Sequence, residues 1–104
     1  MTDAFTLLIK SQFGLTCIKE YKFYPTRKWR FDYSIVELKI AIEVEGGVYT
    51  QGRHTRGKGF VNDMEKYNNA ACEGWLLIRV VPSKLMSADT LDFVRRAIKQ
   101  RNLD

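Results

Sequence analysis

The feature that most constrains how this chain folds is an alternation of apolar and polar residues at positions 38–45, Leu-Lys-Ile-Ala-Ile-Glu-Val-Glu. Successive side chains of a strand point to opposite faces, so the pattern predicts a strand with one apolar face. Glu43 and Glu45 share the other face, with Cα atoms about 7 Å apart on an extended strand. Two glycines follow, which predicts that the strand ends there. The apolar face consists of Leu38, Ile40, Ile42 and Val44.

Residues 29–36 predict a second strand, and burial selects how the two strands pair. One register puts their apolar side chains on one face, around a tight connection at residues 37–38, whereas a shift by one residue mixes polar and apolar faces. This register also sets Asp32 directly opposite Glu43, on the face that carries Glu45. Its apolar pairs are Tyr33 with Ile42 and Ile35 with Ile40.

Asp32, Glu43 and Glu45 would repel one another on one face, since like charges opposed across strands destabilise a sheet. A cation relieves that repulsion, and carboxylate oxygens favour Mg²⁺ or Mn²⁺. Zinc is disfavoured, because its sites use about four ligands and the chain has two cysteines and one histidine. We therefore expect the three acids to form a Mg²⁺ or Mn²⁺ site; the alternative is an ordinary solvated strand face.

The rest of the chain predicts three helices, at residues 3–13, 60–73 and 88–100, and two further strands, at residues 20–23 and 75–81. Its 104 residues (1–104) suffice for a single domain. The order α-β-β-β-α-β-α indicates an α/β fold with a central mixed sheet of about four strands flanked by helices. The helix at 60–73 is expected to bury the stripe Phe60, Met64, Tyr67 and Ala71. Cys17, Cys72 and Trp75 are also expected in the core, both cysteines as free thiols.

The chain is basic: 17 Lys and Arg residues against 12 Asp and Glu give a net charge of +5, which favours a polyanionic partner. Two cationic clusters flank the acidic strands, one in the turn before residues 29–36 and one in a glycine-containing loop after residues 38–45. Such side chains can neutralise phosphates, although solvated loops are the alternative. The predicted DNA contacts are Arg27, Lys28, Arg30, Arg53, His54, Arg56 and Lys58.

No apolar run approaches the ~18 residues needed to cross a bilayer. The amino-terminal residues also lack the basic start and cleavage site of a secretory signal. We therefore expect no membrane association and a cytoplasmic location.

The acidic residues of the two predicted strands, in their order and spacing, resemble the motifs of the PD-(D/E)XK, or restriction-endonuclease-like, nuclease superfamily. Asp32 is followed about ten residues later by Glu43-Val44-Glu45 at the end of an apolar strand. The resemblance covers roughly residues 20–82 and implies a restriction-endonuclease-like fold, divalent-metal hydrolysis of a phosphodiester, and a phage association. Asp32 and Glu43 match the first two motif acids. Similarity to the very short patch repair and phage-type endonuclease branch lies in Ile-Glu-Val-Glu-Gly-Gly, His54, a helix with Asp63 and Lys66, and Gly74-Trp75-Leu-Leu-Ile-Arg79.

The third motif position departs from the superfamily pattern, because Glu45 stands where a lysine usually follows the second acid by two positions. The resemblance implies that Glu45 is a metal ligand, as an acid is at this place in the branch. The missing positive charge must then come from elsewhere or from a second metal. Lys66, beside Asp63 on the predicted helix, is the first candidate for a catalytic role, and a plain ion pair with Asp63 is the alternative. Lys39 and Lys58 are the other candidate lysines.

The sequence thus predicts a Mg²⁺-dependent endodeoxyribonuclease with DNA as its partner and Asp32, Glu43, Glu45 and Lys66 as catalytic residues. Two rival interpretations are a catalytically inactive nucleic-acid-binding module on the same scaffold and a basic structural protein whose acids solvate a strand. The three carboxylates favour the enzyme, whereas the absent lysine favours the inactive module. Cutting both DNA strands requires a homodimer or two sequential nicks, and the sequence does not distinguish duplex, junction, mismatch and single-stranded substrates.

Overall fold

The computed structural model describes residues 2–46 and 58–102, and in this part of the chain three helices pack on a four-stranded mixed sheet. The elements follow one another in the predicted order α-β-β-β-α-β-α. They are α1 (Ala4–Phe13), β1 (Ile18–Lys22), β2 (Arg30–Ile35), β3 (Ile40–Val44), α2 (Lys58–Cys72), β4 (Leu76–Val80) and α3 (Ala88–Arg101). Within these residues, no helix has the length and apolar character needed to span a membrane.

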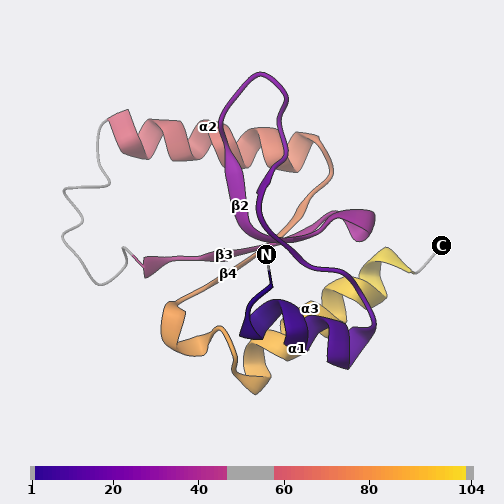
Figure 1. Cartoon of the computed structure of the whole chain (residues 1–104). Helices are drawn as coiled ribbons and strands as arrows, with labels where there is room; N and C mark the ends of the chain where they lie inside the picture. Colours follow the sequence, from indigo (N-terminus) through magenta and orange to yellow (C-terminus); the bar gives the residue numbers. More distant parts are fainter. Residues whose placement is uncertain (1, 47–57, 103–104) are drawn as a thin grey trace.

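The sheet has the strand order β1-β2-β3-β4. The pairs β1–β2 and β2–β3 are antiparallel, whereas β3 and β4 are parallel and therefore need a crossover connection. The helix of that crossover, α2, lies on one face of the sheet, and α1 and α3 lie together on the other face (Figure 1). The prediction of a mixed sheet of about four strands flanked by helices is confirmed.

The predicted register between β2 and β3 is also confirmed, since Tyr33 pairs with Ile42 and Ile35 with Ile40. The connection is longer than predicted. It includes the 3₁₀ turn η1 (Val36–Leu38) and ends at Lys39, whose φ is 53° and whose N–H donates to the Val36 carbonyl at 3.1 Å. Residues 37–38 offer no glycine or asparagine for a two-residue hairpin turn, so a longer turn takes its place.

Two hydrophobic clusters fill the two faces of the sheet, and side chains of β3 alternate between them. Ile40 and Ile42 belong to the larger cluster, and Ala41 belongs to the smaller one, as the alternation at residues 38–45 predicts. The larger cluster joins the sheet to α1 and α3 through Phe5, Ile9, Cys17, Tyr33, Ile35, Val80 and Val94. The smaller cluster joins it to α2 through Phe31, Ala70 and Trp75.

The helix α2 presents a different face from the predicted one. Met64, Ala71 and Cys72 are exposed, so their assignment to the core is wrong, and Ala70 is buried instead. The apolar pattern misplaced the helix because a polar residue, Lys66, lies on its inner side with Ala70. The predicted burial of Cys17 and Trp75 is confirmed, and burial raises the pKa of the Cys17 thiol to about 11.

Asp3 anchors the first helix to the sheet. One carboxylate oxygen accepts the Thr6 N–H at 3.0 Å and caps α1. The other accepts the Tyr33 hydroxyl at 2.6 Å and lies 3.4 Å from the Lys19 ammonium. Although burial opposes ionisation, the hydrogen bonds from Tyr33, Thr6 and Lys19 outweigh it and lower the pKa of Asp3 from 3.8 to about 2.

Replacing Asp3 by asparagine tests this anchor, because Asn still caps a helix but carries no charge. A lowered folded-state pKa means that ionised Asp3 stabilises the fold above its ordinary pKa and that this stability is lost as the pH falls toward 2. Asp3→Asn should therefore lower the free energy of unfolding by about 1–2 kcal/mol near neutral pH and by much less at the acid end. Urea unfolding across pH measures this, with exposed Asp63→Asn as control. An equal loss at all pH values would contradict the ionic role.

Candidate metal and nucleic-acid site

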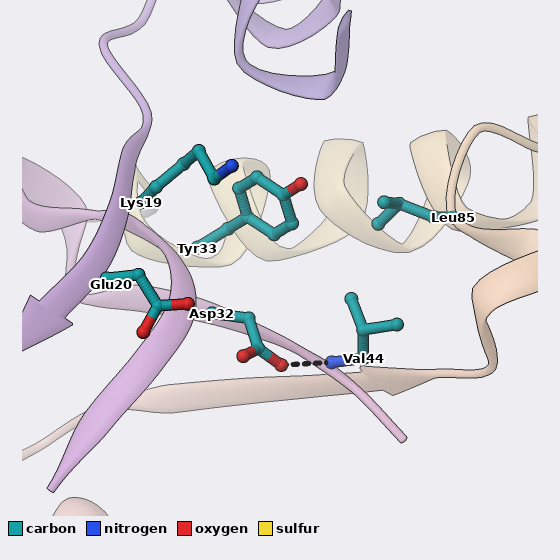
Figure 2. Close-up of a pocket in the computed structure, with 6 residues that line it drawn as sticks. All are labelled: Lys19, Glu20, Asp32, Tyr33, Val44 and Leu85. Atoms are coloured by element: carbon teal, nitrogen blue, oxygen red, sulfur yellow. Dashed lines mark hydrogen bonds between the residues drawn. The ribbon is translucent and has the colours of Figure 1, made fainter. Parts of the chain in front are cut away.

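The backbone ladder between β2 and β3 ends beside two carboxylates. Beyond the Tyr33–Ile42 pair, the Asp32 N–H donates to Glu43 Oε2 at 3.0 Å. The Val44 N–H donates in turn to Asp32 Oδ2 at 2.7 Å, as Figure 2 shows. Side-chain oxygens from each strand thus accept N–H groups of the other strand. Asp32 and Glu43, predicted to face each other, are brought together by these reciprocal bonds.

Strict alternation along β2 does not hold at Asp32. Phe31 and Tyr33 are two residues apart, yet they belong to the two clusters on opposite faces of the sheet. On the adjacent strand, Glu20 lies between the partners of these two residues and has a φ of 55°, a left-handed conformation that is strained for glutamate. The register with β3, rather than regular alternation along β2, therefore brings Asp32 to Glu43.

Glu43 is a nearly buried carboxylate, with its side chain 8% exposed. Its Oε1 accepts the Lys66 ammonium at 3.2 Å and the Tyr67 hydroxyl at 3.0 Å, both from α2. Burial raises the pKa of Glu43, the Lys66 charge and the Asp32 N–H lower it, and the Asp32 charge raises it further. The net effect is a pKa above the ordinary value, so ionised Glu43 depends on its donors.

Lys66 therefore contacts a predicted metal ligand, and the ion pair that the structure gives it is with Glu43 rather than with Asp63. Its side chain is 14% exposed. The other two candidate lysines lie elsewhere or are not described. Lys39 precedes β3 and donates to the Glu73 carbonyl at 2.7 Å, and the Lys58 side chain lies outside the described part of the chain.

Glu45 is paired with Arg79, a residue of the run at positions 74–79 for which the sequence predicted no role at the site. Arg79 Nε donates to Glu45 Oε2 at 2.9 Å, and the guanidinium carbon lies 4.7 Å from the centre of the Tyr67 ring. The hydrogen bond from Arg79 to Glu45 raises the pKa of the guanidinium. Tyr67, which the apolar stripe had assigned to the core, thus contacts both ion pairs. Two sequence signals point to these residues: Tyr67 adjoins Lys66, and Arg79 interrupts the otherwise apolar run at residues 75–81.

An open pocket of about 300 Å³ lies beside Asp32 (Figure 2). Glu20 and Asp32 reach it from neighbouring strands, and Lys19 and Tyr33 line it as well. One oxygen of Asp32 accepts the Val44 N–H, and the other has no hydrogen bond within the described residues. The Asp32 carboxylate is therefore open to a ligand from this side. The remaining lining residues are Val44 and Leu85.

These residues fit a hard divalent cation by their chemistry. Within the described ranges, no group of three His, Cys, Asp or Glu side chains converges to hold a metal. Mg²⁺, however, keeps several waters and is commonly bound by one or two carboxylates together with substrate phosphates. The Asp32–Glu43 pair meets that requirement. Among the described residues Glu45, predicted as the third ligand, does not join the pair in such a group of three, and its Oε2 accepts the Arg79 Nε–H instead.

Of the three predicted DNA contacts that the structure describes, Arg27 makes the most contacts with other residues of the chain. It donates to Asn62 at 3.1 Å, lies 3.7 Å from the Glu65 carboxylate, and stacks over the Trp29 ring at 4.0 Å. Lys28 and Arg30 are exposed. Arg53, His54 and Arg56, like the Lys58 side chain, lie outside the described residues.

Comparisons of the chain with protein-family models, curated proteins and solved structures found no match.

The buried ion pair predicts a non-additive effect on stability. Lys66→Met leaves the nearly buried Glu43 charge without its cation and should lower the free energy of unfolding by roughly 1–3 kcal/mol. Because the folded-state pKa of Glu43 is already raised, stability falls as the pH rises through that pKa, and this fall should steepen without Lys66. The double variant Lys66→Met/Glu43→Gln should recover most of the loss in urea unfolding.

A matched control for this prediction is Arg96→Met, which breaks an exposed ion pair with Asp92 on α3. It should change the unfolding free energy by less than about 1 kcal/mol. Additive losses from Lys66→Met and Glu43→Gln would show that the two charges are not coupled.

Proposed function

We propose that this chain is a Mg²⁺- or Mn²⁺-dependent endodeoxyribonuclease with a restriction-endonuclease-like fold, as the resemblance to the PD-(D/E)XK superfamily implies. The observation that carries the proposal is the reciprocal bonding of Asp32 and Glu43 where the β2–β3 ladder ends. Two acids at such a position interrupt the regular hydrogen bonding of the sheet. A role as ligands of a cation would account for their presence there. The mixed sheet and its three helices are compatible with an α/β fold, which the proposal requires.

The residues around the acids suit hydrolysis of a phosphodiester. A divalent metal, when bound, polarises the phosphate and lowers the pKa of a coordinated water. Asp32 and Glu43 would hold the metal, and the resemblance implies Glu45 as a third ligand. Lys66, 3.2 Å from Glu43, would supply positive charge next to the reacting phosphate. Tyr67 restricts the orientation of Glu43 through its 3.0 Å hydrogen bond.

DNA is the proposed substrate because its backbone is a polyanion and the chain carries a net charge of +5. Lys28 and Arg30 supply exposed cations, and the basic residues at positions 53–58 remain predicted contacts. Phosphate contacts of this kind orient a nucleic acid without reading its sequence. They therefore favour recognition of the backbone or of a DNA structure.

Cleavage of duplex, junction, mismatched and single-stranded DNA by the purified chain tests the proposal. At least one substrate should be cut with Mg²⁺ and spared with a chelator. Asp32→Asn and Glu43→Gln should each abolish cutting while the fold, measured by circular dichroism, is kept, because each removes a metal-binding charge. Asp92→Asn, an exposed acid on α3, should cut normally.

Wild-type rates in either site variant would reject the assignment. DNA binding without metal-dependent cutting of any substrate would instead favour the catalytically inactive nucleic-acid-binding module.

The role of Lys66 has a distinct kinetic signature. If its charge acts in the transition state, Lys66→Ala should lower the cleavage rate far more than it lowers affinity for metal or DNA. Lys66→Arg should recover part of the rate, because a planar guanidinium does not match a compact ammonium. Lys39→Ala, which removes a lysine bound to the Glu73 carbonyl, serves as control. Normal turnover of Lys66→Ala below its melting temperature would remove this role from Lys66.

A further inference from the structure

The two cations that contact the acidic residues differ in their accessibility. Lys66 is 14% exposed and directs its ammonium to Glu43. Arg79 is 53% exposed and contacts Glu45 through Nε alone. Within the described residues, its two terminal nitrogens have no hydrogen-bond partner. The exposed edge of the guanidinium is therefore available to a ligand.

The position of Arg79 follows from the sheet. In the parallel register of β3 and β4, Arg79 pairs with Glu43. Its neighbours Leu76, Ile78 and Val80 pack in the larger cluster, so the arginine occupies the opposite face, where α2 lies. On that face the Glu45 carboxylate and the Tyr67 ring hold the guanidinium from two sides. This arrangement restricts a side chain that is otherwise flexible, which lowers the entropy lost when it binds.

An anion that approaches on the face of α2 meets the carboxylates of Glu43 and Glu45, which contact Tyr67 and Arg79, and it needs a compensating positive charge. Guanidinium presents parallel N–H donors that match two oxygens of a phosphate, and an exposed, oriented arginine forms stronger contacts than a mobile one. An ordinary surface ion pair would contribute little to stability, in general about 0–1 kcal/mol. Stability alone therefore gives a weak reason for this arrangement.

We propose that Arg79 binds the phosphodiester of the nucleic acid next to the acidic residues, with Glu45 and Tyr67 as the groups that position its guanidinium. This inference rests on the proposed function, whose substrate it specifies: a backbone phosphate held by an arginine of β4. It places near Glu45 a positive charge that the superfamily lysine would otherwise provide, and it leaves Lys66 with Glu43.

Binding of a short fluorescent DNA duplex, measured by anisotropy across salt concentrations, tests the inference. The buffer contains Ca²⁺, which takes the same oxygen ligands as Mg²⁺, and the length of the DNA is checked after each measurement. Arg79→Ala and Arg79→Gln should each weaken binding roughly tenfold and reduce the salt slope by about 0.9, the value for one lost phosphate contact. Arg79→Lys should restore the slope but only part of the affinity, because it keeps the charge and loses the paired donors.

The matched control is Arg96→Ala on α3. Arg96 is exposed, contacts the Asp92 carboxylate at 3.4 Å and lies 5.1 Å from the Phe93 ring, so, like Arg79, it pairs with a carboxylate near an aromatic ring. Its helix, α3, lies on the other face of the sheet from α2 (Figure 1). Its loss should leave affinity and salt slope unchanged. Thermal melting of each variant shows that binding is compared among folded proteins.

Wild-type affinity and slope in both Arg79→Ala and Arg79→Gln would overturn the inference, as would a loss equal to that of Arg96→Ala. Its failure is distinguishable from failure of the proposed function. Arg79-dependent binding without metal-dependent cleavage would reject only the nuclease, whereas cleavage with binding that ignores Arg79 would reject only this inference.

Discussion

The rest of the site depends on the hydrogen bonds that stabilise the nearly buried carboxylate of Glu43. A carboxylate removed from water is stable only with donors, and Glu43 takes them from the Asp32 backbone, Lys66 and Tyr67. These donors join β2, β3 and α2 at one point. They also set the rotation of α2, since Lys66 and Tyr67 face the sheet with Ala70 while Met64 and Cys72 face solvent.

The same arrangement links structure to the proposed chemistry. The β2–β3 ladder stops at the acids, Glu20 keeps a strained backbone on the adjacent strand, and a pocket opens beside Asp32. Strain and buried charge of this kind are common at functional sites, where local stability is lower than it otherwise would be. Burial is the main cause of the raised pKa of Glu43, and the Asp32 charge adds to it; a bound cation would oppose both effects by favouring the ionised carboxylate.

The pairing of β2 with β3 could be predicted from the sequence, because it follows from alternation and burial. Contacts between polar side chains far apart in the chain could not be predicted. The pairing of Tyr33 with Ile42 followed from the need to bury apolar side chains on one face. The rotation of α2 did not follow from its apolar pattern, because Lys66 faces inward only through a partner on β3. The pairing of Arg79 with Glu45 depends on the parallel β3–β4 register, which no local pattern in the chain specifies.

Mn²⁺ titration followed by nuclear magnetic resonance tests directly whether Asp32 and Glu43 together hold a divalent cation. Paramagnetic Mn²⁺ binds where Mg²⁺ does and broadens the signals of nearby nuclei. The amide signals of Asp32, Glu43 and Val44 should broaden first, and Asp32→Asn should abolish this. Broadening that begins at acids of α3, such as Asp92, or that persists unchanged in Asp32→Asn, would contradict a cation site at Asp32 and Glu43.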